Sequence, residues 1–398
     1  MGETVALIVA AGRGHRVGAT LPKQYLPLGG RAVLCHSVAA FAELDEIDAV
    51  RVAIHADDAA LYERALAPLA AALRGKLLEP VLGGESRQDS VRNGLESIAS
   101  RKPARVLIHD GARPLASAEV IRRTLDALAT HPGAIAALPV SDTLKRVQPD
   151  AAALPLSAGT VERAQLWRAQ TPQSFHYDAI LAAHRGARGQ RLTDDAAVAE
   201  AAGLAVALVA GSEDNIKVTT SEDLARAERI LDARLSEVRV GFGFDVHAFG
   251  AGEALMLCGV RVPHTQGLIG HSDADVGLHA LTDAILGALG AGDIGAHFPP
   301  SEARWRAASS ALFLGHAASL VAQAQGRIAH VDVTLIAEAP RIAPHRAAMV
   351  GRIAELLGLP PDRVSLKATT TEGLGFTGRG EGIAAQALAT LRLPPAVR

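Results

Sequence analysis

Short β-like runs alternate with Ala- and Leu-rich helical runs over the first 235 residues of the 398-residue chain. The runs expected to form strands are 5–11, 49–55, 77–81, 105–109, 133–139 and 205–210. The runs expected to form helices are 33–42, 59–73, 87–97, 118–129, 177–186 and 221–235. This alternation predicts an α/β domain with a doubly wound, mostly parallel sheet, which binds ligands beyond the carboxyl ends of its strands.

The first expected strand leads into a loop that combines glycines with basic side chains. These residues are Gly12, Gly14, Gly18, Arg13, Arg16 and Lys23. Glycines let backbone N–H groups approach an anion and the cations neutralise it, so we predict a phosphate-binding loop. A glycine turn with solvated basic residues is the alternative. The spacing does not fit a dinucleotide fingerprint, because Gly18 falls one residue late, or a Walker A loop, because no glycine precedes Lys23.

Composition excludes several classes of partner. The net charge is −2 and only 3% of the residues are aromatic, so the chain has neither a basic footprint nor many side chains for stacking on bases. Its two cysteines lie far apart in the sequence and favour a reducing compartment. We expect no signal peptide. The expectation is therefore a cytoplasmic protein that binds neither nucleic acid nor a membrane.

Polar residues also follow the later strands of the first half. Gly83 and Ser90 lie in G-G-E-S-R-Q-D-S-V and could bind part of a nucleotide, or form a Ser-capped helix after a glycine turn. Asp110 and Arg113 in H-D-G-A-R-P fit a magnesium–phosphate site, or a surface ion pair. Further basic residues, which we expect in loops, suggest a site for several phosphates: Lys145, Arg146, Arg163, Arg168 and Lys217.

These motifs together resemble one family of nucleotidyltransferases with a Rossmann-like fold. A-A-G-R-G-H-R-V-G with P-K-Q-Y, G-G-E-S-R-Q-D-S-V, H-D-G-A-R-P, W-R-A-Q-T-P-Q and D-N-I-K-V-T are similar, in order, to 2-C-methyl-D-erythritol 4-phosphate cytidylyltransferase. A small departure is Gly111, where many relatives have alanine. The resemblance implies that a polyol phosphate attacks the α-phosphorus of CTP and expels pyrophosphate, in the methylerythritol phosphate route to isoprenoids.

The resemblance also implies roles for individual residues. Arg16 and Lys23 would stabilise the α-phosphate in the transition state, and Mg²⁺ would bind with CTP near Asp110. Arg163 and Lys217 would hold the methylerythritol phosphate. The other implied contacts to substrate are at Ala10, Ala11, Gly12, Gly14, Gly83, Ser90 and Arg113.

The sequence pattern changes after Leu235, at the end of an amphipathic segment that begins with Ser221 as its N-cap. No Pro- or Ser-rich tether follows. We therefore predict a cytidylyltransferase domain at 1–235, joined directly to a second domain at 236–398.

The second half opens with a candidate metal site. Asp245 and His247 are two residues apart, so they share one face of an extended strand. With His279 on a following helix they form a reasonable zinc set that leaves one coordination position open. Asp283, one turn further along, is a candidate to orient His279. Capping or core histidines are the alternative.

A second set of motifs resembles another enzyme of the same route. G-F-D-V-H, H-S-D-A-D-V-G-L-H-A-L-T-D-A, G-D-I-G, V-D-V-T, T-T-T-E and G-F-T-G-R-G-E-G are similar to 2-C-methyl-D-erythritol 2,4-cyclodiphosphate synthase. The resemblance implies a smaller α+β domain that binds Zn²⁺, or another divalent cation, through Asp245, His247 and His279. The cation acts as Lewis acid and template while the 2-phosphate attacks the β-phosphorus and CMP leaves.

By the same resemblance Thr370, His271 and Ser272 orient the diphosphate. The other implied contacts to substrate, besides the metal ligands Asp245 and His247, are at Asp293, Gly295, Phe298, Ala337, Ala343, Thr369, Thr371, Glu372, Phe376 and Arg379. Three departures affect peripheral positions: Pro300 and Ser309 replace acids, and Gly373 replaces a lysine. The synthase family forms trimers and the transferase family tends to dimerise, which implies a homo-oligomer, trimeric through the second domain or hexameric.

The sequence therefore suggests a bifunctional enzyme that acts on CTP and polyol phosphates in two non-consecutive steps. One alternative makes the second half a zinc-stabilised trimerisation module without catalysis. Another makes the first half a nucleotidyltransferase for a different sugar or polyol phosphate.

Overall fold

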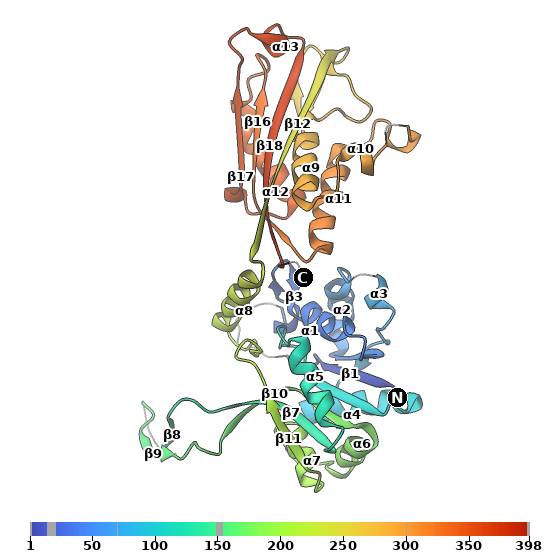
Figure 1. Cartoon of the computed structure of the whole chain (residues 1–398), viewed down its shortest axis with the longest axis vertical. Coiled ribbons are helices and arrows are strands. Elements are labelled where there is room, and N and C mark those ends of the chain that lie inside the picture. The colour runs from blue at the N-terminus through green and yellow to red at the C-terminus, as the bar shows by residue number, and fades with distance from the viewer. Residues whose placement is uncertain (1, 14–20, 70, 149–153, 300, 396–398) are drawn as a thin grey trace. The chain divides into compact units, whose positions relative to one another are not determined.

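The computed structural model describes residues 2–13, 21–69, 71–148, 154–299 and 301–395. The chain divides into two compact units, Met1–Leu231 and Asp232–Arg398. Figure 1 shows the course of the chain through both. Gly14, Arg16, Gly18 and Pro300, which the sequence motifs single out, lie outside the described residues.

The first unit is built on a seven-stranded sheet in the order β11-β7-β10-β6-β1-β4-β5. Its strands are β1 (Thr4–Val9), β4 (Ala49–Ile54), β5 (Val81–Leu82), β6 (Arg105–Asp110), β7 (Gly133–Pro139), β10 (Trp167–His176) and β11 (Val206–Ala210). Only β10 runs antiparallel to its neighbours β6 and β7. The predicted mostly parallel sheet is confirmed, but β10 was not expected, and the strand expected at 77–81 is reduced to β5.

Helices cover both faces of this sheet. They are α1 (Val33–Ala42), α2 (Ala59–Leu66), α3 (Ala71–Arg74), α4 (Arg87–Ser97), α5 (Ala118–Ala127), α6 (Tyr177–Gly186) and α7 (Asp195–Ala201), followed by α8 (Ser221–Arg234). Alternate residues of β1 face opposite sides, so Ala6 and Ile8 join the apolar cluster of α1 and α5. Val5 and Leu7 join the cluster of α4 and α6. The helix expected at 59–73 is divided into α2 and α3, and α7 was not expected.

Two small antiparallel ribbons complete the unit. One pairs β2 (Pro27–Leu28) with β3 (Arg31–Ala32) and the other pairs β8 (Leu144–Val147) with β9 (Ser157–Val161). The second ribbon extends away from the sheet in Figure 1, and its side chains are mostly exposed. Lys145 and Arg146 lie on β8 and Arg168 lies on β10, so the expectation that they stand in loops is wrong.

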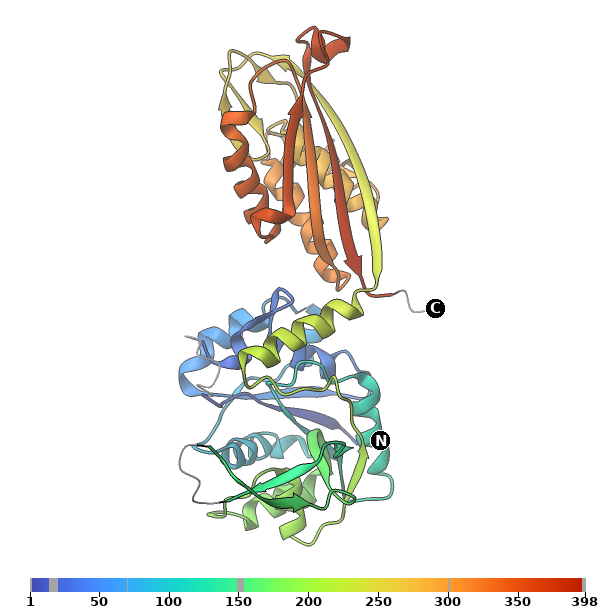
Figure 2. The ribbon, with the colours of Figure 1, turned by 90° about the vertical axis from the view of Figure 1, so that its left-hand side faces the viewer.

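The second unit has a five-stranded mixed sheet in the order β15-β12-β18-β16-β17. Its strands are β12 (Glu237–Gly250), β15 (Gly267–Leu268), β16 (Arg327–Ile336), β17 (Val364–Thr369) and β18 (Gly382–Leu393), with a separate pair β13 (Ala254–Leu257) and β14 (Val260–Pro263). Its helices are α9 (Val276–Leu289), α10 (Ile294–His297), α11 (Ser310–Gln323), α12 (Arg346–Leu357) and α13 (Gly375–Gly378). The long helices α9, α11 and α12 pack on one face of the sheet (Figure 2).

The backbone of α9 lies directly against the backbone of β12. A Cβ atom at Gly243 would lie 1.9 Å from the carbonyl oxygen of Ala280, and one at Gly241 would lie 1.9 Å from that of Ala284. Real Cβ atoms do not approach a carbonyl oxygen this closely, because the atoms would overlap. The glycines alternate with exposed residues such as Phe242, so they lie on the helix-facing side of β12.

Among the described residues, we find no helix whose length and apolar character would suit it to span a membrane.

We predict that Gly243→Ala lowers the stability of the second unit by at least about 1–3 kcal/mol, because overpacking forces α9 away from β12. Gly287→Ala is the matched control: no atom lies within 3.4 Å of a Cβ there, so the change should be neutral or stabilising by up to about 1 kcal/mol. Hydrogen exchange of peptides that cover α9 measures the effect of both substitutions. Equal protection in the two variants would contradict the close contact.

Candidate active sites

The loops after β1 and β5 meet at the carboxyl edge of the first sheet. A Cβ at Gly83 would lie 2.3 Å from Cβ of Ala11 and 2.8 Å from Oγ of Ser90. The buried Gln24 donates from Nε2 to the carbonyl oxygens of Ala10 (2.7 Å) and Gly12 (3.1 Å). Sequence reasoning missed Gln24. Lys23, beside it, begins a 3₁₀ turn at Lys23–Tyr25.

Gly111 lies close to Ala10, and Arg13 does not have the role that its motif suggests. A Cβ atom at Gly111 would lie 3.0 Å from Cβ of Ala10, which is a tight contact. Arg13, expected to neutralise a bound anion, is instead held by carboxylates of the β4–α2 turn. Its guanidinium lies 2.8 Å from Asp57 and 3.0 Å from Asp58.

Asp110, at the end of β6, is the centre of a largely buried charge cluster. Its carboxylate lies 3.0 Å from Arg87 Nε, 2.7 Å from Lys217 Nζ and 3.7 Å from Arg113 Nε. The Asp110 and Arg113 side chains are 10% and 12% exposed, which excludes the surface ion pair that the sequence left open. Burial raises the pKa of Asp110, but the three cations outweigh it and hold that pKa well below its usual range.

A second buried carboxylate supports this cluster from behind. Arg87 Nη2 lies 2.8 Å from Asp195, which in turn lies 3.2 Å from His184 Nε2. Burial lowers the pKa of Arg87, but Asp195 and Asp110 more than compensate and raise it. Arg87, which lies in the same motif as Gly83 and Ser90, therefore bridges two carboxylates. Asp195 was missed, because it begins the unexpected helix α7.

The backbone of Asp110 is also fixed. Its N–H donates to Thr171 Oγ1 (3.1 Å), and Thr171 Oγ1 lies 3.0 Å from His109 Nδ1. The other ring nitrogen of His109 lies 2.9 Å from the carbonyl oxygen of Arg113. Burial lowers the pKa of His109 to about 4, so the imidazole is neutral near pH 7 and holds both ends of the H-D-G-A-R-P turn.

The predicted basic residues do not all gather at Asp110. Lys217 does, but Arg163 donates to the carbonyl oxygen of Ser141 near the exposed β8–β9 ribbon. Arg168 pairs with Glu213. The described contacts therefore join Lys217, Asp110 and Arg113, and they give Arg163 a different partner.

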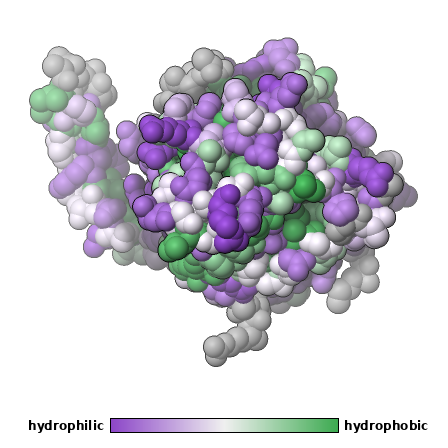
Figure 3. Space-filling model, turned by 90° about the horizontal axis from the view of Figure 1, so that it is seen from above, coloured by the Kyte–Doolittle hydropathy of each residue, from purple (hydrophilic) through white to green (hydrophobic). Residues whose placement is uncertain are grey.

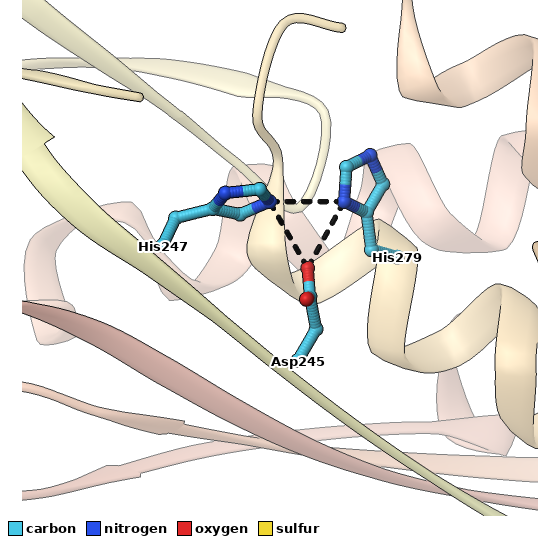
Figure 4. A group of neighbouring side chains, drawn as sticks. All are labelled: Asp245, His247 and His279. Atoms are coloured by element: carbon cyan, nitrogen blue, oxygen red, sulfur yellow. Dashed lines mark hydrogen bonds and ion pairs between the residues drawn. The ribbon is translucent and has the colours of Figure 1, made fainter. Parts of the chain in front are cut away.

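In the second unit three candidate ligand atoms converge (Figure 4). Asp245 Oδ2 lies 3.1 Å from His247 Nε2 and 3.0 Å from His279 Nδ1, and the two nitrogens are 3.1 Å apart. Burial raises the pKa of Asp245, but the two neighbouring histidines outweigh this effect and hold that pKa well below its usual range. Burial likewise lowers the pKa of His247, and Asp245 overcomes this effect and raises it.

The donor set fits a divalent cation. His247 Nδ1 lies 2.8 Å from the carbonyl oxygen of Ile269, which can only accept, so Nδ1 carries the proton and Nε2 presents a lone pair. Two imidazole nitrogens and a carboxylate oxygen then lie within 4.8 Å of one another, a set typical of zinc. Gly241 and Gly243 let β12 approach α9 closely, and this close approach brings the ligand atoms together.

Asp283 has a different partner from the one expected. Its carboxylate accepts the N–H of Ile294 (2.7 Å) at the start of α10, whereas the ring nitrogens of His279 face Asp245, His247, Ser272 and Ser310. The expectation that Asp283 orients His279 is therefore wrong. Burial raises the pKa of Asp283.

Two loops that carry predicted contacts to substrate lie side by side. Glu338 Oε1 accepts the N–H of Thr371 (3.1 Å), and the N–H of Ala337 donates to the carbonyl oxygen of Thr369 (3.1 Å). Thr370 donates to Glu372 (2.9 Å). Glu338, which sequence reasoning missed, thus joins the segment 337–343 to the threonine loop.

The remaining predicted positions surround these loops and α10. Asp293 Oδ1 caps α10 through the N–H of Ala296 (2.8 Å), and Phe298 packs against Phe313 with ring centroids 4.4 Å apart. Arg379 pairs with Glu381 at the surface (2.8 Å). Phe376 and His271 are exposed.

Two of the departures, Gly373 and Ser309, lie among the described residues. Gly373 has a φ of +77°, a conformation in which a lysine would be strained. Ser309 is exposed and its side chain makes no capping bond to α11, so the missing acid leaves the ligand residues unaffected.

Comparison with known proteins agrees with both halves. The family model described as 2-C-methyl-D-erythritol 4-phosphate cytidylyltransferase matches residues 4–233, and that of the YgbB family matches 238–392. A bifunctional enzyme IspD/IspF of Paramagnetospirillum magneticum is 60% identical over 395 residues, which cover 99% of this chain and 100% of that protein. The Rhodospirillum rubrum protein of the same description is 58% identical over 394 residues, with the same coverage. The solved structure of the bifunctional IspDF from Campylobacter jejuni is 30% identical, covers 98% of both chains and gives a TM-score of 0.47.

Proposed function

The chain belongs to the family of bifunctional IspD/IspF enzymes, and from this premise we propose which residues perform each of its two activities. It is an enzyme of the methylerythritol phosphate pathway with a cytidylyltransferase and a cyclodiphosphate synthase domain. We assign the first activity to residues 1–235 and the second to 236–398.

For the first activity we propose that CTP binds over the edge of the sheet, at Ala10, Ala11, Gly12, Gly14, Gly83 and Ser90. The observation that carries this proposal is the buried cluster around Asp110, which gathers Arg87, Arg113 and Lys217. Asp110 is ionised there and would hold Mg²⁺ with CTP, while Arg113 would clamp a phosphate. Lys217, with a 38% exposed side chain, and Arg163 would hold the polyol phosphate.

The chemistry needs positioning and charge stabilisation. The oxygen of the polyol phosphate attacks the α-phosphorus of CTP, the bond to the β-phosphate breaks and pyrophosphate leaves. Negative charge accumulates at the α-phosphate during this step, and Arg16 and Lys23 would stabilise it.

We predict that Lys23→Ala slows CTP-dependent pyrophosphate release about 10²–10³-fold, the effect of losing one preorganised donor to the transition state. CMP release by the second unit should remain. Lys102→Ala is the control, because Lys102 is exposed and precedes β6 at the opposite edge of the sheet. Near-normal pyrophosphate release by the Lys23 variant would contradict the assignment.

For the second activity we propose that Asp245, His247 and His279 hold a divalent cation, Zn²⁺ by the chemistry of the donor set. When bound, the cation supplies Lewis acidity and a template for the diphosphate. Thr370, His271 and Ser272 would orient the diphosphate for attack by the 2-phosphate on the β-phosphorus. The other substrate contacts would come from Asp293, Gly295, Phe298, Ala337, Ala343, Thr369, Thr371, Glu372, Phe376 and Arg379.

We also propose that the chain is a homo-oligomer, trimeric through the second domain, with a hexamer as the larger alternative. Large apolar side chains alternate along the face of β12 opposite α9: Val238, Val240, Phe242, Phe244 and Val246, which are 38–61% exposed. Exposed apolar surface of this extent usually marks an interface. Figure 3 shows hydrophobic (green) and hydrophilic (purple) side chains intermixed on the part of the surface seen from above.

We predict that Phe242→Asp reduces the mass in solution to that of a single chain, because a charge in an apolar interface is left unpaired. Leu312→Asp is the control, since Leu312 is equally exposed but lies on α11, on the helical side. Light scattering during size-exclusion chromatography gives the mass. A wild-type mass equal to one chain, or an unchanged mass for the Phe242 variant, would contradict the proposal.

A further inference from the structure

His279 is held from both sides of its ring. Nδ1 faces the proposed metal site, 3.0 Å from Asp245 and 3.1 Å from His247. Nε2 faces away from it, 2.8 Å from Ser310 Oγ and 3.0 Å from Ser272 Oγ. If Nδ1 binds a cation, the ring proton must lie on Nε2, where these residues receive it.

Ser310 has its own fixed partner, the carboxylate of Asp273. Ser310 is the first residue of α11 and is fully buried. Its backbone N–H lies 3.1 Å from each carboxylate oxygen of Asp273, and its hydroxyl hydrogen-bonds to Oδ1. An ionised carboxylate can only accept, so the hydroxyl proton of Ser310 points to Asp273.

The position of each proton in the hydrogen-bonded series Asp273–Ser310–His279 then follows. Because Ser310 donates to Asp273, its oxygen is left to accept the Nε2–H of His279. With the proton on Nε2, His279 presents the Nδ1 lone pair to Asp245 and His247. This is the neutral tautomer that a metal ligand bound through Nδ1 requires.

We propose that Asp273 and Ser310 are positioning residues that fix the orientation and tautomer of His279 for metal binding. The proposal rests on the proposed function, since it presumes that His279 is a ligand. Neither residue was singled out from the sequence as acting on the metal: Ser310 follows the departure at Ser309, and Asp273 lies between Ser272 and the helix cap Asp275.

Ser272 does not duplicate this role. Its hydroxyl oxygen also accepts the N–H of Ala274 (3.1 Å), and its side chain has no carboxylate among its described hydrogen-bond partners to set the direction of its own proton. Ser272 is half-buried and is proposed to contact the diphosphate, whereas Ser310 is sealed from solvent. The orientation of His279 therefore depends chiefly on Ser310.

The test is the zinc affinity of the full chain, measured by competition with a chromophoric chelator on protein first stripped of metal. Ser310→Ala and Asp273→Asn should each weaken zinc binding about 10–100-fold, the usual effect of removing a partner that orients a ligand. Ser309→Ala, the exposed neighbour, should stay within about twofold. Because the residues act in series, Ser310→Ala with Asp273→Asn should bind zinc no more weakly than Ser310→Ala alone.

Hydrogen exchange of α9 and α11 in the metal-free variants shows whether each remains folded. If Ser310→Ala unfolds the second unit, Asp273→Asn tests the same series of hydrogen bonds with the Ser310 hydroxyl in place. Wild-type zinc affinity in a folded variant, or additive losses in the double variant, would overturn the inference. If His279→Ala binds zinc as tightly as the wild type, the proposed metal site itself fails, which is a separate result.

Discussion

The second unit depends on a contact in which no side chain intervenes, that of the α9 backbone with β12 at Gly241 and Gly243. Any larger residue would push the helix outward. The same strand face continues to Asp245, and the same helix carries His279, so the contact sets the distance between these ligand residues. Packing of the backbone therefore comes first, and the metal chemistry follows from it.

The two sites arrange charge in opposite ways. Around Asp110, cations and carboxylates are paired in a mostly buried network, which keeps Asp110 ionised and fixes Arg87 through Asp195. Around His279, a carboxylate and two nitrogen lone pairs are gathered without a cation among the described residues to match them. The charges of the first cluster are paired with one another, whereas the second gathers three candidate ligand atoms. Only the second therefore indicates a metal directly.

Local periodicity in the sequence was sufficient to predict the first sheet and part of the candidate metal site. The alternation of strand and helix predicted the parallel sheet, and the two-residue spacing of Asp245 and His247 placed both on one face of β12. Strand β10 was missed because most of its buried residues are polar. Gln170, Thr171 and Ser174 satisfy their hydrogen bonds with distant partners, so the segment has no alternating apolar pattern. The pairings of Arg13, Arg87 and Ser310 could not be read from the sequence either. Each depends on a residue brought near only by the fold.

The central claim is that one chain carries two separate sites, one of them built on Asp245, His247 and His279. The most direct measurement compares His279→Ala with the wild type in one preparation, for zinc content, CMP release and CTP-dependent pyrophosphate release. The variant should lose zinc and CMP release and retain pyrophosphate release at the wild-type rate. Loss of both activities in a folded chain, or CMP release at the wild-type rate without bound metal, would contradict it.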